Sequence, residues 1–257
     1  MKSLPDMVSI REIVDGDRPS RLAEYAINTF QLHDALFCDA KFADQPDPYR
    51  NSLGFYYAHS AAFARKKLFE HLGIGKSHML DDLLWRGVSP LEPFSVNPQI
   101  ANLDPEILRV YVEETNKLLL DTINSRFANE QALVMEFDSN LWLILTILEH
   151  QRLHLATTLP HLMSLRATSN NIRSLDTVEK DFNFIDVKGG NVSFGREFDE
   201  IIMNFGWDNE FGVRNVSVPD FIVTQHPVTI AQFQEFINAD GYHNPKYWSV
   251  IGKRWKE

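Results

Sequence analysis

Two histidines, His150 and His154, stand four residues apart inside an apolar run that begins at Leu141. This run predicts a helix with a buried face, and residues i and i+4 lie on the same side of a helix, about 6 Å apart along its axis. A buried imidazole needs a polar partner, and two imidazoles at this spacing can hold one metal ion. The segment therefore predicts a core helix that carries two candidate metal ligands.

A third candidate ligand, His59, lies in a second amphipathic pattern, Phe55-Tyr-Tyr-Ala-His-Ser-Ala-Ala-Phe. Three imidazoles from two facing helices would form a metal site inside a helical bundle. Phe55, Tyr56 and Tyr57 are expected to be core residues. His161 lies two turns beyond His154, which is too far to share the ion. The other histidines are scattered and are expected to be ordinary surface or core residues: His33, His71, His78, His226 and His243.

Composition limits the class of protein. The 257 residues are 44% hydrophobic and 23% charged, as in globular proteins, and the net charge of −10 without a basic stripe argues against nucleic acid and acidic membranes as partners. One cysteine, Cys38, excludes a disulfide framework and indicates a reducing compartment; a buried thiol is favoured over a catalytic one. The N-terminus has no signal-peptide pattern and no apolar stretch is long enough to span a membrane, so a cytoplasmic protein is expected.

Helical periodicity fills the first two thirds of the chain and predicts a four-helix bundle over residues 1–168. Gly73 is a helix stop, Asp104-Pro105 is a helix start, and Pro160 predicts a kink. A polar connection that contains prolines covers 75–103, and a polar linker covers 169–181. The expected helices span approximately 19–42, 53–72, 104–128 and 138–167.

Residues 182–257 have the pattern of a small α+β domain, so the predicted fold class of the whole chain is α+β. Alternation over 184–195 predicts strands and a hairpin, 216–223 predicts a further strand, and Thr229 opens a short helix that ends near Gly241. This segment is small for a core of its own, so we expect it to be less stable than the bundle. Apolar residues expected at its surface include Phe221, Phe233, Phe236 and Trp248.

Several motifs recur together in one order along the chain. They are His59, His150-x-x-x-His154, Gly189-Gly190, Phe205-Gly-Trp-Asp-Asn-Glu210, His226-Pro-Val-Thr-Ile-Ala-Gln-Phe and Gly241-Tyr-x-x-Pro-x-Tyr-Trp248. In this order they resemble the sulfoxide synthases of ergothioneine and ovothiol biosynthesis. The resemblance implies a DinB-like four-helix bundle followed by a truncated C-type-lectin-like domain, of the formylglycine-generating-enzyme or sulfatase-modifying-factor kind. Phe55-Tyr-Tyr-x-His59 and Leu148-Glu-His-x-x-x-His-Leu favour the ovothiol branch, the 5-histidylcysteine sulfoxide synthases.

The resemblance also implies chemistry. The family holds one non-heme iron(II) ion with three histidines, and His59, His150 and His154 match those positions. The implied reaction uses O2 to join a thiol, cysteine or γ-glutamylcysteine, to the imidazole of histidine or a methylated histidine, and yields a sulfoxide. Gly206-Trp-Asp-Asn-Glu210 is expected to be a structural turn.

Two departures from the family pattern leave alternatives open. The family motif His-x-x-x-His-x-Glu ends here in Ala156, and Gln151 stands where the family often has Glu. The family's lectin-like domain continues beyond the Tyr-Trp motif, so the chain is expected to be a fragment, a shortened paralogue or one half of a split enzyme. Such a form would self-associate or need a partner chain, and alone it is expected to make little of the C–S product. The alternatives are a catalytically impaired paralogue or interaction subunit, and a DinB-like metal-dependent thiol transferase. The Gly-Trp-Asp-Asn-Glu region argues against the transferase.

Overall fold

The computed structural model describes residues 5–10, 19–46, 50–85, 98–127, 136, 139–166, 182–197 and 205–256. Its contacts divide the chain into two compact units, and helices together with short sheets give the α+β class. The helical unit comprises Met1–Asn170 and Phe198–Glu210, and the second unit comprises Asn171–Glu197 and Phe211–Glu257. Residues 205–210, which the sequence placed with the C-terminal domain, therefore group with the helices.

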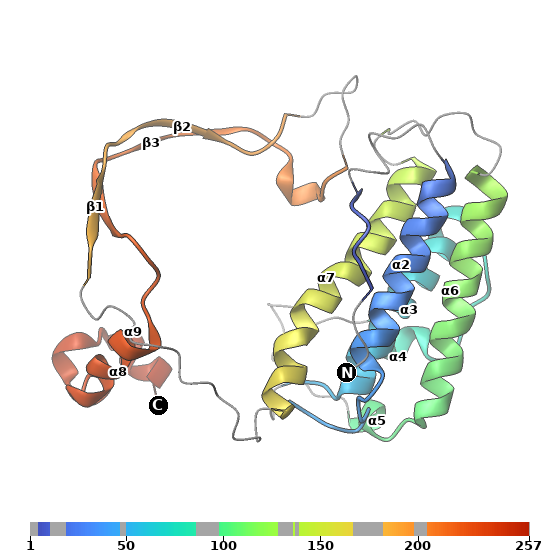
Figure 1. Cartoon of the computed structure of the whole chain (residues 1–257), viewed down its shortest axis with the longest axis horizontal. Coiled ribbons are helices and arrows are strands. Elements are labelled where there is room, and N and C mark those ends of the chain that lie inside the picture. Colours follow the sequence, from blue (N-terminus) through green and yellow to red (C-terminus); the bar gives the residue numbers. More distant parts are fainter. Residues whose placement is uncertain are drawn as a thin grey trace. The chain divides into compact units, whose positions relative to one another are not determined.

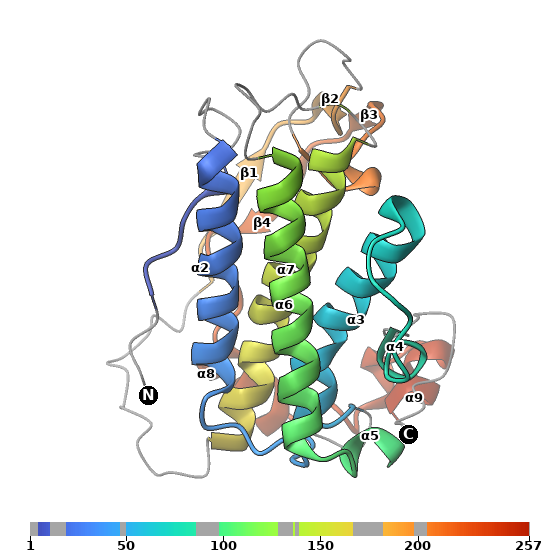
Figure 2. The same ribbon diagram turned by 90° about the vertical axis from the view of Figure 1, so that its right-hand side faces the viewer.

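In the part of the chain that the structure describes, four long helices form the helical unit (Figures 1 and 2). Helix α3 packs against both α6 and α7, and α2 packs against the same two helices. The two short helices lie in the connection between α3 and α6. The bounds are α2 (Pro19–Phe37), α3 (Leu53–Leu72), α4 (Asp81–Trp85), α5 (Pro98–Ala101), α6 (Pro105–Phe127) and α7 (Asn140–Arg166).

Local signals set most of these helix ends where the sequence predicts them. Gly73 ends α3 with a left-handed φ of 64°, which a residue without a Cβ adopts freely. The Asp104 carboxylate accepts the Glu106 N–H at 2.9 Å at the start of α6, and the Ser139 hydroxyl accepts the Trp142 N–H at 3.2 Å at the start of α7. Pro160 lies inside α7, as predicted.

One helix end in this unit was predicted wrongly, and two short helices were not predicted. Helix α2 ends at Phe37 rather than near 42, because the chain turns there and Phe42 is buried beside Gly54, whose N–H donates to the Phe42 carbonyl at 2.9 Å. The connection over 75–103 contains α4 and α5, which were not predicted. Leu84 of α4 is fully buried, so packing stabilises a helix too short to show a period in the sequence. Residues 86–97 lie outside the described ranges.

The bundle interior contains two groups of buried apolar side chains, and α3 contributes to both. One group surrounds Leu68 of α3 and Leu148 of α7; the other surrounds Phe55 and Tyr57 of α3 and Tyr111 of α6. Phe55, Tyr56 and Tyr57 are buried, as predicted. Because the C-terminal halves of α3 and α6 share the first group, these two helices run in the same direction, and the long connection returns the chain along the bundle.

The second unit contains two antiparallel strand pairs. Strand β1 (Phe184–Val187) pairs with β4 (Phe221–Thr224), and β2 (Gly190–Phe194) pairs with β3 (Arg214–Val218). The hairpin expected over 184–195 is therefore absent, since β1 and β2 pair with other strands. The expected strand over 216–223 is likewise divided, by Pro219 and Asp220.

A close backbone approach explains this division. A Cβ at Gly189 would lie 2.3 Å from the Val218 carbonyl oxygen. The backbone segments at Gly189 and Val218 therefore approach each other so closely that only glycine fits. The Asp220 carboxylate accepts the Gly189 N–H at 2.8 Å and the Lys188 ammonium at 2.7 Å. These bonds join the turn between β1 and β2 to the turn between β3 and β4, where one strand pair ends and the other begins.

Two short helices follow the strands. Helix α8 (Ile230–Asn238) begins at Thr229, as predicted, with a reciprocal cap between Thr229 and Gln232. Helix α9 (Val250–Lys256) follows and was not predicted.

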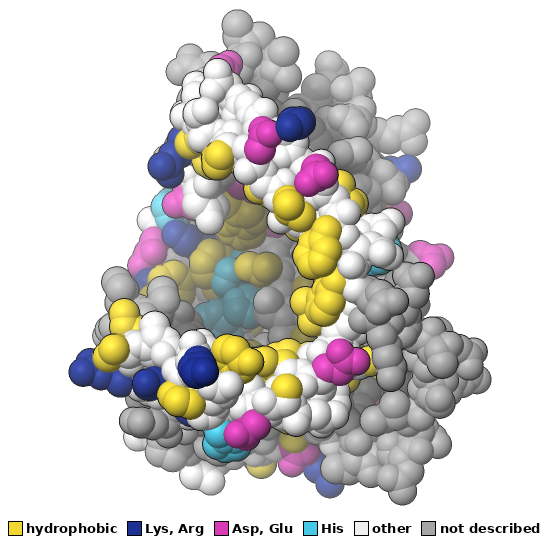
Figure 3. All heavy atoms as spheres, turned by 90° about the vertical axis from the view of Figure 1, so that its left-hand side faces the viewer, with side chains coloured by type: hydrophobic (Ala, Val, Ile, Leu, Met, Phe, Trp, Pro, Cys, Tyr) yellow, Lys and Arg dark blue, Asp and Glu magenta, His cyan; other side chains and the backbone are white. Residues whose placement is uncertain are grey.

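Hydrophobic side chains of this unit lie at its surface. Figure 3 shows such side chains, in yellow, on the part that faces the viewer. Every buried hydrophobic residue of the described ranges belongs to the helical unit. Phe221 and Phe233 are exposed, as predicted, whereas Phe236 and Trp248 are half-buried. Within the described residues, no helix combines the length and apolarity needed to cross a membrane.

Candidate metal centre

Three imidazoles from two helices come together inside the bundle. His59 projects from α3, and His150 and His154 project from adjacent turns of α7. One ring nitrogen from each of the three lies within 4.8 Å of the other two. The Nε2 atoms of His150 and His154 are 3.2 Å apart, and the His59 ring centroid lies 4.7 Å from that of His154. The convergence occurs because α3 and α7 pack face to face and the i,i+4 spacing repeats on one side of α7.

His59 is held in one orientation. Its Nδ1 lies 2.7 Å from the carbonyl oxygen of Leu84, which can only accept a hydrogen bond, so Nδ1 carries the proton and Nε2 carries the lone pair. The ring also stacks on Phe55, with centroids 5.0 Å apart. A hydrogen bond from the second ring nitrogen to a backbone carbonyl is the usual way in which proteins orient a histidine that binds metal.

His150 is held by stacking. Its ring lies 3.8 Å from the Phe63 ring with an interplanar angle of 12°, and Phe63 in turn stacks on Trp85 at 5.7 Å. Its Nδ1 is buried and has no hydrogen-bond partner among the residues that the structure describes. Aromatic contacts therefore fix the plane of this ring, while Nε2 points to His154.

Burial keeps all three imidazoles neutral. It lowers the pKa of His59 below the ordinary 6.5, although the Leu84 carbonyl opposes the shift. Burial and the neighbouring histidines also lower the pKa of His150 and of His154. Neutral imidazole is the form that binds metal, so the lone pairs are available at neutral pH without loss of a proton.

The donor set suits a divalent transition metal. Ligand nitrogens about 2 Å from one ion lie roughly 3 Å from one another, and the Nε2 atoms of His150 and His154 have this separation. Small ring movements would bring the third nitrogen to the same point. Three neutral imidazoles suit zinc, iron, nickel or copper, and they leave coordination positions open for other ligands.

The other candidate residues of the sequence are not members of this ligand group. The metal-ligand cluster among the described residues contains only the three histidines, and His161 instead lies near Tyr56, with ring centroids 5.3 Å apart. Cys38 is a free, half-buried thiol just beyond α2. Gln151 is buried, whereas Ala156 is exposed.

The Gly206–Glu210 motif forms a local turn, as predicted. Asp208–Glu210 is a short 3-10 helix, and the Trp207 N–H donates to the Glu210 carboxylate at 2.8 Å. Its hydrogen bonds satisfy its own backbone, which is the structural role expected from the sequence.

A polar network beside the ligands was not predicted. Glu149 accepts a hydrogen bond from the Tyr25 hydroxyl, and the Arg152 guanidinium lies 3.9 Å from the Tyr25 ring centroid. Arg152 also donates to Thr29 Oγ1, Val8 O and Asn28 Oδ1, each at 2.9 Å. The charged pair within an apolar run was the available signal, but the partners lie more than a hundred residues away along the chain.

Comparison with known proteins supports the C-terminal resemblance. Residues 173–257 match the family described as the sulfatase-modifying factor enzyme 1-like domain. A segment of 66 residues is 36% identical to a protein named hercynine oxygenase from Mycolicibacterium smegmatis. That segment is 26% of this chain and 15% of the relative, so the chain matches a small part of its relative's length. Residues 173–257 are thus similar to sulfatase-modifying-factor domains, and a segment of the chain is similar to part of a protein named hercynine oxygenase.

Proposed function

We propose that this chain is a sulfoxide synthase of the ergothioneine and ovothiol type, or a shortened or split form of one. In this proposal it holds non-heme iron(II) and uses O2 to join a cysteine-type thiol to a histidine-derived imidazole. The observation that carries the proposal is the convergence of His59, His150 and His154 in the same chain as a sulfatase-modifying-factor-like domain. The similarity to the hercynine oxygenase supports the same class of reaction.

The proposed reaction balances without another reductant. The S–H bond of the thiol and one C–H bond of the imidazole ring break, and a C–S bond and an S=O bond form. O2 accepts four electrons, and its two oxygen atoms appear in the sulfoxide and in one molecule of water. Iron(II), when bound, would supply coordination positions for the thiolate and O2 and lower the pKa of the thiol.

The chain's own residues would hold and shield the reactants. His59 directs Nε2 to the ion site because its Nδ1 is bonded to the Leu84 carbonyl, and stacking on Phe63 fixes the orientation of the His150 ring. All three ligands are imidazoles rather than carboxylates, so they would add no negative charge that repels a thiolate. Phe55 and Phe63 stack on two of the three rings, and their apolar surfaces would keep water from those sides of the group.

The test is anaerobic reconstitution with iron(II), followed by O2 with cysteine or γ-glutamylcysteine and with histidine or its trimethylated form. The readouts are O2 consumption and mass spectrometry of the products. We expect about one iron per chain and a product in which the thiol and the imidazole are joined as a sulfoxide, formed only in small amounts by a shortened or split form without its partner chain. His59→Ala should lose both iron and product, whereas His161→Ala, which changes a nearby histidine outside the cluster, should keep both.

Other outcomes decide among the alternatives. Iron binding with O2 consumption but without a C–S product would identify a catalytically impaired paralogue or a subunit that needs another chain. Tight zinc binding and transfer of the thiol without O2 would identify a DinB-like thiol transferase. Absence of any metal bound by the three histidines would contradict the whole proposal.

A further inference from the structure

The short helix α4 contacts two of the three candidate ligands. The carbonyl oxygen of Leu84 accepts the hydrogen bond from His59 Nδ1. The next residue, Trp85, stacks on Phe63, and Phe63 stacks on His150. Leu84 lies in the last turn of a five-residue helix, where carbonyls have no partner within the helix, so its oxygen is available to the imidazole. The position of α4 therefore bears on both His59 and His150.

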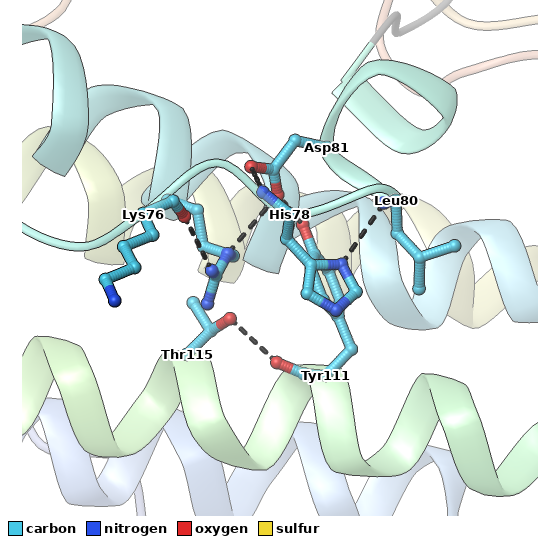
Figure 4. Close-up of polar contacts among 7 residues, drawn as sticks. Lys76, His78, Leu80, Asp81, Tyr111 and Thr115 are labelled. Atoms are coloured by element: carbon cyan, nitrogen blue, oxygen red, sulfur yellow. Dashed lines mark hydrogen bonds and ion pairs between the residues drawn. The ribbon is translucent and has the colours of Figure 1, made fainter.

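Helix α4 is too short to hold its own position, and Asp81 at its first residue secures it. Figure 4 shows the Asp81 carboxylate among polar groups from the preceding loop and from α6. Oδ2 accepts the His78 N–H at 2.8 Å, and Oδ1 accepts the Tyr111 hydroxyl at 2.6 Å. Oδ1 also lies 3.3 Å from Nε of Arg65 on α3. One carboxylate thus joins α4 to both long helices beside it.

This network is mostly shielded from water. The side chains of Asp81 and Arg65 are only 15% and 11% exposed, so their attraction is weakly screened. The partners are themselves held in place: Arg65 donates to the Lys76 carbonyl at 2.9 Å, and His78 Nδ1 accepts the Leu80 N–H at 3.1 Å. Fixed partners on three sides allow the carboxylate to set where α4 starts.

We propose that Asp81 is a positioning residue for the metal centre. It fixes α4 so that the Leu84 carbonyl selects the Nδ1–H form of His59, and so that Trp85 supports the ring that stacks on His150. Asp81 acts only through α4. The inference rests on the proposed function in one respect, namely that the three histidines bind a divalent metal ion.

The experiment compares the full chain with Asp81→Asn and with Asp82→Asn. Asp82 is exposed in the same helix turn, so its substitution removes an equal charge without changing the network. The probe is Co²⁺ added without O2, with its dissociation constant taken from the visible absorption of the bound ion. Nitrogen NMR of the histidine rings in the metal-free chain reports the tautomer of His59 independently of metal.

We expect Asp81→Asn to raise the Co²⁺ dissociation constant at least about tenfold, the scale on which outer groups tune metal ligands. It should also replace the single Nδ1–H form of His59 by a mixture of tautomers. Asp82→Asn should match the unsubstituted chain in both readouts. Should Asp81→Asn lose the helical circular dichroism, Tyr111→Phe carries the test, because it removes one hydroxyl and leaves the Arg65 ion pair. It should then shift both readouts in the same direction by a smaller factor.

Two results separate the inference from the proposed function. Failure of the unsubstituted chain to bind Co²⁺ through the three histidines contradicts the metal centre itself. The second result is normal Co²⁺ binding by the unsubstituted chain, with the same dissociation constant and His59 tautomer in Asp81→Asn (or in Tyr111→Phe, where that variant carries the test) as in Asp82→Asn. This result overturns the role of Asp81 and leaves the metal centre standing.

Discussion

Replacing Arg152 by methionine should destabilise the helical unit by about 3 kcal/mol. Arg152 joins α7 to α2 and to residues 5–10 through three hydrogen bonds of 2.9 Å, and its guanidinium lies over the Tyr25 ring. Hydrogen bonds to a charged group contribute about 1.5–3 kcal/mol each, so three bonds at the lower value contribute about 4.5 kcal/mol. Methionine keeps the apolar stem, and water can reach part of the vacated acceptors, which reduces the expected loss to about 3 kcal/mol.

The measurement is urea unfolding of the full chain followed by circular dichroism, with hydrogen exchange of the Val8 amide as a local readout. Val8 N–H donates to Asn28 Oδ1 at 3.1 Å, and Arg152 holds the same oxygen, so that amide should lose protection. Arg152→Lys should cost about half as much, because an ammonium keeps the charge but cannot reach three acceptors in a fixed fork.

Leu153→Ala is the matched control for this prediction. Leu153 is the next residue of α7 and is 51% exposed, so its truncation should cost less than about 1 kcal/mol. A loss below about 1 kcal/mol for Arg152→Met, or equal protection of the Val8 amide in both variants, would refute the reasoning that this network ties the N-terminal segment to the bundle.

Three further predictions follow from single contacts. His154→Ala should abolish iron(II) binding, measured by elemental analysis of the reconstituted chain. His71→Ala changes an exposed residue of the same bundle and should leave the iron content unchanged, and equal iron contents in the two variants would remove His154 from the site. Burial raises the pKa of Tyr57 from 10.0 to about 12, so its neutral phenol contributes about 2–3 kcal/mol of stability, which is fully present below pH 10 and is lost as the pH rises through 12. Tyr57→Phe should make the unfolding free energy fall less steeply between pH 10 and 12, and an unchanged slope would contradict the assignment. Gly189→Ala should remove the amide protection of both strand pairs, because its Cβ would lie 2.3 Å from a carbonyl oxygen, whereas Gly190→Ala has no atom within 4 Å of its Cβ and should retain protection in hydrogen-exchange experiments.

The helix ends and the histidine cluster were accessible from the sequence because their signals are local or periodic. Gly73 and Asp104-Pro105 act on the backbone of their own turns, and the spacing of His150 and His154 places both on one side of any helix. His59 was named as the third ligand from a second amphipathic pattern and from a family resemblance, and the structure brings the three rings together.

The parts that escaped prediction depend on distant partners. Helix α4 has a single turn and is too short to be stable alone. It forms because Leu84 is buried and because Asp81 makes an ion pair with Arg65 and accepts a hydrogen bond from Tyr111. Strand β1 pairs with β4 rather than with β2, and alternation along a strand cannot reveal which strand is its neighbour.

The division of the three histidines between α3 and α7 gives a bound metal ion the role of a removable cross-link. An ion held by His59 and by the α7 pair closes the chain between those helices into a loop, and it binds the folded bundle much better than the unfolded chain. At a free metal concentration one hundred times the dissociation constant, mass action adds about 2.7 kcal/mol to the stability of the bundle. The melting temperature of the helices should therefore rise with the fraction of chains that hold the ion, and a chelator should lower it without any change to the sequence.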